Sequence, residues 1–157
     1  MPLSRRQIIS LAGAGSAALL LAAFAFQLAG YAPCDLCILQ RWPHAAAVVI
    51  AIIAVLTGGG RFWALVGAAA AAVATGLALY HTGVELHWWP GPAACTGGVA
   101  DIGALSVDDL MQRIRSAEVV RCDQPAVLIF GFSMAAWNAL ASAVLTLLWL
   151  GASRRGA

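Results

Sequence analysis

Charged residues are scarce in this chain, and their scarcity excludes a water-soluble fold. Only 10% of the 157 residues are charged, whereas 62% are hydrophobic. A water-soluble domain usually carries roughly 25% charged residues, so water cannot be the main solvent of this chain. The net charge of +2 is small and no basic run is interleaved with aromatic residues, which gives no support for nucleic acid as a partner. Internal repeats are also lacking, and we expect one membrane domain over residues 1–157.

Four apolar segments contain no Lys, Arg, Asp or Glu. A helix of ~20 apolar residues crosses the ~30 Å of hydrocarbon in a lipid bilayer. We expect membrane spans at about residues 8–28, 43–59, 62–81 and 127–150. Pro43 either begins the second span or kinks it. The sequence therefore predicts an all-α integral membrane protein, a bundle of four transmembrane helices.

Charges at the ends of the spans predict the orientation. One face of the bundle carries arginines only, namely Arg5, Arg6, Arg61, Arg154 and Arg155. By the positive-inside rule this face is cytoplasmic, and both termini lie there. All seven acidic residues fall in the two remaining loops, about 29–42 and 82–126. These loops are expected to be periplasmic, in the inner membrane of a bacterium.

The N-terminus permits a second interpretation. "LSRRQIIS" followed by an apolar run is similar to a twin-arginine export signal, and "AFA" at 23–25 is similar to a cleavage site. However, the apolar core of a signal is usually ~7–15 residues long, and this run is longer. Cleavage would also leave an odd number of spans. We therefore expect an uncleaved first helix.

All four cysteines fall in the two predicted periplasmic loops. An oxidising compartment allows such thiols to form disulfides. Cys95 and Cys122 enclose a long loop that a passive disulfide would stabilise, so a structural role stays open for them. A bridge between Cys34 and Cys37 closes almost no loop entropy, and Cys-x-x-Cys is better suited to thiol–disulfide exchange. A four-cysteine zinc site would need a second Cys-x-x-Cys, so no metal is expected.

Three features together resemble the disulfide bond formation protein B (DsbB) family. They are "PCDLCILQR" at 33–41, the separated cysteine pair in the second loop, and "YHTGVELHWWPGPAAC" at 80–95. The resemblance covers nearly the whole chain. It implies a quinone-dependent protein-disulfide oxidoreductase with its active cysteines on the periplasmic face. Such an enzyme reoxidises a periplasmic thioredoxin-fold oxidase similar to DsbA and passes the electrons to ubiquinone or menaquinone.

The resemblance also implies a role for each cysteine. Cys95 would be attacked by the thiolate of the partner oxidase, and Cys122 would then attack Cys34. Cys37 would pass the electrons to the quinone. At rest, we expect the oxidised pairs Cys34–Cys37 and Cys95–Cys122.

Two further residues are candidates for quinone binding. Arg41 follows Cys37 by four positions, which places both on one face of a helical turn. Its guanidinium needs a polar partner at the lipid boundary, either a quinone oxygen or a thiolate, unless it extends to lipid phosphates. His81 could hydrogen-bond a quinone oxygen, although an interfacial histidine with ordinary partners is commoner. Asn138, inside the fourth span, is expected to form an interhelical hydrogen bond.

The long second loop contains one predicted helix. "SVDDLMQRIRSA" at 106–117 begins with Ser106 as an N-cap, and its apolar residues follow helical spacing. This short amphipathic helix would lie on the outer leaflet or pack on the bundle. Trp88 and Trp89 are expected in the aromatic belt at the membrane surface.

Other functions remain open from the sequence. A protein similar to vitamin K epoxide reductase also pairs Cys-x-x-Cys with four spans, but there the motif is expected late in the chain. A structural tetraspan would use its cysteines as passive bridges. A thiol reductase that sends electrons outward would need a cytoplasmic electron source, and no cysteine lies on the predicted cytoplasmic face.

Overall fold

The computed structural model describes residues 3–92, 106–108, 111 and 120–155. Its long helices are α1 (Arg5–Leu28), α2 (Asp35–Leu56), α3 (Arg61–Glu85) and α5 (Met134–Arg154). A two-stranded antiparallel hairpin, β1 (Leu128–Ile129) and β2 (Phe132–Ser133), precedes α5. These 4 helices are each long and apolar enough to cross a membrane. The all-helical, multi-pass architecture predicted from the sequence is confirmed.

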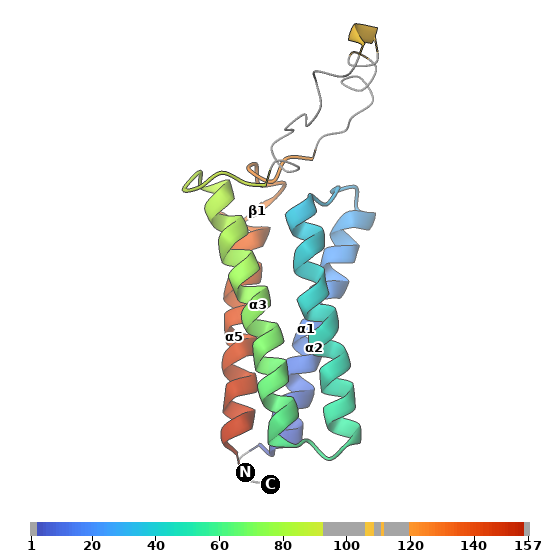
Figure 1. Cartoon of the computed structure of the whole chain (residues 1–157), viewed down its shortest axis with the longest axis vertical. Helices are drawn as coiled ribbons and strands as arrows, with labels where there is room; N and C mark the ends of the chain where they lie inside the picture. The colour runs from blue at the N-terminus through green and yellow to red at the C-terminus, as the bar shows by residue number, and fades with distance from the viewer. Residues whose placement is uncertain (1–2, 93–105, 109–110, 112–119, 156–157) are drawn as a thin grey trace.

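The four helices form an elongated bundle (Figure 1). α1 packs against α2, α2 against α3, α3 against α5, and α5 against α1. In this ring α2 and α5 occupy diagonal positions. Both described ends of the chain lie at one end of the bundle, and the β-hairpin lies at the other (Figure 1). Which end faces the cytoplasm stays a prediction.

Small residues allow the helices to approach closely. The buried face of α3 consists largely of alanine and glycine: Ala64, Gly67, Ala68, Ala71, Ala74 and Ala78. A Cβ atom built on Gly67 would lie 2.4 Å from the ring of Trp149, and the Trp149 side chain is fully buried. Because lipid tails are as apolar as leucine, helices in a membrane associate through close packing of this kind. Gly67 thus makes the space that Trp149 fills.

Helix α2 begins at Asp35, well before the span predicted at residue 43. Cys34 acts as its N-cap, since the Cys34 side chain accepts the backbone N–H of Cys37. Asp35 adds a negative charge in the first turn, where the helix dipole favours it. Pro43 lies inside the helix, so its interpretation as the first helical residue was wrong. The Cys-x-x-Cys motif therefore starts a helix instead of lying in a loop.

The last helix also begins later than the span predicted at residue 127. Helix α5 begins at Met134 because residues 128–133 form the hairpin, whose turn contains Phe130 and Gly131 at φ 51° and 82°. Positive φ at both turn positions matches the twist of a tight hairpin. Helix α3 continues to Glu85. Cys95 and most of the predicted amphipathic helix lie outside the described residues.

Candidate redox site

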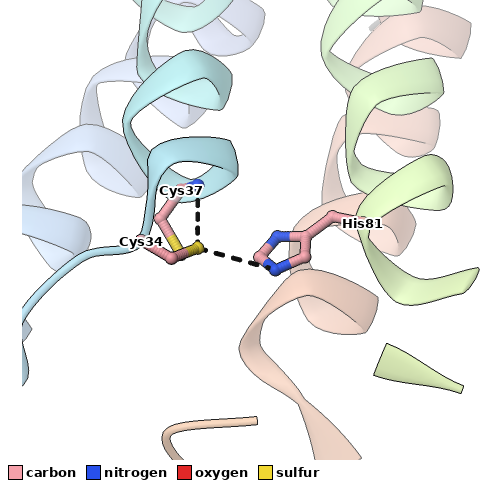
Figure 2. A group of neighbouring side chains, drawn as sticks. All are labelled: Cys34, Cys37 and His81. Atoms are coloured by element: carbon pink, nitrogen blue, oxygen red, sulfur yellow. Dashed lines mark hydrogen bonds between the residues drawn. The ribbon is translucent and has the colours of Figure 1, made fainter. Parts of the chain in front are cut away.

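The two thiols of the Cys-x-x-Cys motif lie side by side at the start of α2. The Cys34 thiol donates to Cys37 Sγ at 2.8 Å, and Cys34 Sγ accepts the backbone N–H of Cys37 at 3.2 Å (Figure 2). Both cysteines are free. The structure therefore shows the reduced pair, whereas the sequence predicts the oxidised pair at rest. The two forms differ by two electrons and two protons.

The two sulfurs differ in their electrostatic surroundings. The hydrogen bond to Cys37 raises the pKa of the Cys34 thiol, and burial raises it further. Cys34 therefore keeps its proton. Cys37 accepts that S–H and lies in the first turn of α2, where backbone N–H groups favour a negative charge. Negative charge on the pair is accordingly placed on Cys37.

His81 faces the thiols from α3 (Figure 2). Its Nε2 atom lies 3.7 Å from Cys34 Sγ and 3.8 Å from Glu85 Oε1. Its Nδ1 atom lies 2.7 Å from Gln40 Nε2. The sequence suggested His81 as a quinone ligand, and the structure adds that both of its nitrogens already have protein neighbours.

These residues form a possible set of metal ligands. The ligand atoms of Cys34, Cys37 and His81 all lie within 4.8 Å of one another. Two thiolates and an imidazole are suitable ligands for Zn²⁺. The cysteine spacing predicts no four-cysteine metal site, yet this different donor set could hold a thiophilic ion when the thiols are reduced.

Cys122 lies next to the same site. Its side chain is fully buried and packs in one cluster with Cys34, Leu36 and Val84. Cys122 is disulfide-bonded, and its backbone takes part in a hydrogen bond with His81. Two of the four cysteines predicted to be catalytic, from distant parts of the sequence, thus belong to one buried cluster. Cys95 lies in the part of the chain that the structure does not describe.

A partly exposed ion pair flanks Cys122. Arg121 donates to both carboxylate oxygens of Asp123, at 2.9 and 2.6 Å. These hydrogen bonds hold the pKa of Asp123 below its usual value. Bidentate contact between a guanidinium and a carboxylate has a defined geometry, so the pair can hold the backbone on both sides of Cys122.

Arg41 lies one turn beyond Cys37 on α2. Its Nη1 atom donates to Gln27 Oε1 at 2.7 Å, and its guanidinium carbon lies 4.7 Å from the centre of the Phe24 ring. Both partners belong to α1. The buried Nε atom of Arg41 has no hydrogen-bond partner among the described residues. Arg41 is therefore attached to α1 and keeps its buried Nε–H group available to a ligand.

A cavity of about 550 Å³ adjoins the thiols. Part of its apolar wall comes from α1, through Leu19, Leu20, Ala22, Ala23 and Phe26, and the rest comes from α5 and the residues that precede it. Cys37, Arg41 and Glu85 supply polar groups, and Glu85 Oε2, like Arg41 Nε, is a buried atom without a partner in the described part of the chain. A cavity of ~300–1,000 Å³ with mostly apolar walls and a few polar groups is typical of a small-molecule site.

A polar network extends from this cavity into the bundle. Asn138 of α5 donates to Gln40 Oε1 at 2.7 Å, and its Oδ1 atom lies 3.1 Å from His44 Nε2. The interhelical hydrogen bond predicted for Asn138 is confirmed. Gln40 and His44 were not predicted to take part. Their spacing of four positions inside an apolar helix was an available signal, because polar residues in a span usually face a partner.

Comparison with known proteins finds a family and a relative. The family described as "Disulfide bond formation protein DsbB" matches residues 5–152. An uncharacterized protein of Rickettsia prowazekii (strain Madrid E), RP370, is 28% identical over 122 residues, which cover 77% of this chain and 70% of the relative. No solved structure matches the chain.

Proposed function

Because this chain belongs to the disulfide bond formation protein DsbB family, we propose that it reoxidises a periplasmic thioredoxin-fold oxidase similar to DsbA and passes the electrons to a membrane quinone. Family membership makes the chain a membrane disulfide oxidoreductase. One observation carries the finer proposal: the Cys34–Cys37 pair shares a buried cluster with Cys122 and borders a cavity of mostly apolar lining.

The proposed route uses two disulfide exchanges. The two thiols of the partner oxidase become its disulfide, while the Cys95–Cys122 disulfide is reduced to two thiols. The Cys122 thiolate then attacks Cys34 of the Cys34–Cys37 disulfide and expels the Cys37 thiolate, which is the better leaving group because its sulfur carries the charge more easily. The Cys95 thiolate next attacks Cys122, which restores the Cys95–Cys122 disulfide and leaves Cys34 and Cys37 reduced. The buried cluster that Cys122 shares with Cys34 supports this order. Closure of the Cys34–Cys37 disulfide finally releases two electrons and two protons.

The cavity fits a quinone ring. A bound quinone would supply the chemistry that the chain lacks, because it accepts two electrons and two protons. Arg41 Nε is an unpartnered donor suited to a quinone oxygen, and Glu85 Oε2 is an unpartnered acceptor suited to a hydroxyl. We assign Arg41 to a quinone oxygen. His81, the second quinone ligand predicted from the sequence, lies beside the thiols with both ring nitrogens next to protein groups, so we assign it to the thiols. Ubiquinone and menaquinone both present two oxygens across a ring.

The proposed orientation places the thiols in the periplasm of a bacterium, with the helix-flanking arginines in the cytoplasm. Arg5 donates to the backbone carbonyls of Ala152 and Arg155. This contact joins the start of α1 to the end of α5. The thiol pair would then lie between the membrane, which holds the quinone, and the periplasm, which holds the partner oxidase.

A direct assay tests this function. The purified protein is mixed with a reduced thioredoxin-fold oxidase and a short-chain ubiquinone, and the loss of quinone absorbance is followed. We expect turnover in the wild type and none in Cys34→Ser or Cys37→Ser. Thr75→Val serves as a control. The Oγ1 atoms of Thr75 and Thr146 lie 3.3 Å apart, and this pair is separate from the thiol site. Equal quinone loss in Cys34→Ser and wild type would contradict the proposal.

A further inference from the structure

A chain of hydrogen bonds crosses the bundle and ends at His81. Asn138 Nδ2 donates to Gln40 Oε1, and Gln40 Nε2 lies 2.7 Å from His81 Nδ1. At the far end, His44 Nε2 and Ser142 Oγ lie 3.1 and 3.3 Å from Asn138 Oδ1. Gln40, His44, His81 and Ser142 are buried. The chain therefore links the diagonal helices α2 and α5 through the bundle interior, and α3 through His81.

The carbonyl of Leu36 fixes the direction of this chain. Gln40 Nε2 also donates to Leu36 O at 3.0 Å. A carbonyl oxygen only accepts hydrogen bonds, so the nitrogen of the Gln40 amide must face Leu36 and its oxygen must face Asn138. Reversing the amide would place two oxygens against each other. Gln40 can therefore present only a donor to His81 Nδ1.

His81 must then carry its proton on the other ring nitrogen. A neutral imidazole accepts at one nitrogen and donates at the other, so acceptance at Nδ1 puts the proton on Nε2. That nitrogen lies 3.7 Å from Cys34 Sγ (Figure 2). We propose that Gln40 is a positioning residue: it keeps His81 in the tautomer that directs a donor toward the Cys34 sulfur.

The catalytic consequence rests on the proposed function. If the Cys34–Cys122 bond formed during exchange is resolved by the Cys95 thiolate, a Cys95–Cys122 bond forms and the electron pair of the broken bond stays on Cys34. The Nε2–H group of His81 would stabilise this transient charge on a buried sulfur until Cys34 takes up the proton that Cys95 has lost. Gln40 should therefore affect the rate of disulfide exchange. It should not affect quinone binding, which is assigned to Arg41.

Nitrogen NMR tests the tautomer directly. The chain has three histidines, and a His87→Asn variant simplifies the spectrum of reduced, ¹⁵N-histidine-labelled protein in detergent micelles. We expect wild-type His81 to be neutral with its proton on Nε2. Gln40→Met keeps a similar length and removes the donor, so both tautomers should be populated. Turnover should fall about tenfold, the order expected for one hydrogen bond to a charged group, with an unchanged KM for a short-chain ubiquinone.

Two further variants separate positioning from simple loosening of the bundle. Asn138→Leu leaves Gln40 bound to Leu36 and should shift the tautomer less than Gln40→Met. Thr75→Val removes an unconnected polar contact between α3 and α5 and should change neither tautomer nor turnover. A wild-type His81 with its proton on Nδ1 or on both nitrogens would overturn the proposal, as would an unaltered spectrum in Gln40→Met. A wild type that consumes no quinone would instead contradict the proposed function, since the tautomer is measured without quinone.

Discussion

Cys122 and Cys34 belong to one buried cluster, although the two cysteines come from opposite sides of α3 in the sequence. Cys122 is disulfide-bonded and Cys34 is free. Thiol–disulfide exchange requires a thiolate to reach a disulfide sulfur, and these side chains already share one cluster. The fold therefore brings one cysteine of each pair to the same place, as exchange between the pairs would require.

The first prediction concerns the order of this exchange. Cys122→Ser removes the thiol that would resolve the first attack, so a mixed disulfide between Cys95 and the partner oxidase should accumulate. Non-reducing electrophoresis should show an adduct that dithiothreitol removes. Cys95→Ser is the matched control and should give no such adduct. If peptide mapping places the partner on Cys34, the proposed order of electron flow is wrong.

The second prediction concerns orientation. Cys34 and Cys122 are buried, so probe cysteines at exposed positions give a cleaner test in a variant whose four cysteines are replaced by serine. Trp88→Cys at the thiol end should react with a membrane-impermeant reagent in intact spheroplasts. Thr57→Cys, at the opposite end of the bundle, should react only after lysis. Labelling of the two positions in the reverse order would place the thiols in the cytoplasm.

Long apolar runs made the helices predictable, but the sequence could not show how the helices are rotated. Four segments without charge fit the thickness of a membrane, and all four helices are found. The start of the second span was predicted at residue 43 because Cys34 was treated only as a redox residue. Cys34 is also the N-cap of α2, so the helix begins at Asp35. The contact of Gln40 with Asn138 depends on the diagonal placement of α2 and α5, which no local pattern encodes.

The third prediction tests the packing of α3 against α5. Gly67→Ala places a Cβ atom 2.4 Å from the Trp149 ring, and overpacking of this kind costs about 1–3 kcal/mol. Gly76→Ala is the matched control on the same helix, because nothing lies within 4 Å of its added Cβ. Unfolding in mixed micelles should show Gly67→Ala destabilised and Gly76→Ala unchanged or more stable. Equal stability of the two variants would mean that Trp149 has room to move.

The fourth prediction concerns metal ions. In the reduced protein, Zn²⁺ should bind to Cys34, Cys37 and His81 and stop turnover, because both thiols become ligands and cannot form a disulfide. Turnover should return when a chelator is added. The oxidised protein is the control, since a disulfide has no thiolate to offer. Equal zinc binding by the reduced and oxidised forms, measured by equilibrium dialysis, would place the ion elsewhere.

The last prediction concerns Arg41, whose Nε donor is unpartnered beside the cavity. Arg41→Lys keeps the charge and loses the planar fork, and Arg41→Met loses both. If Arg41 binds the quinone ring, the apparent KM for quinone should rise in the order wild type, Lys, Met, by about tenfold or more for Met, since a hydrogen bond to a charged group is lost. Gln27→Leu, which removes the Nη1 partner and keeps the charge, should raise KM less than Arg41→Met. Identical quinone kinetics in all these proteins at equal membrane abundance would mean that Arg41 only connects α2 to α1 and does not bind the quinone.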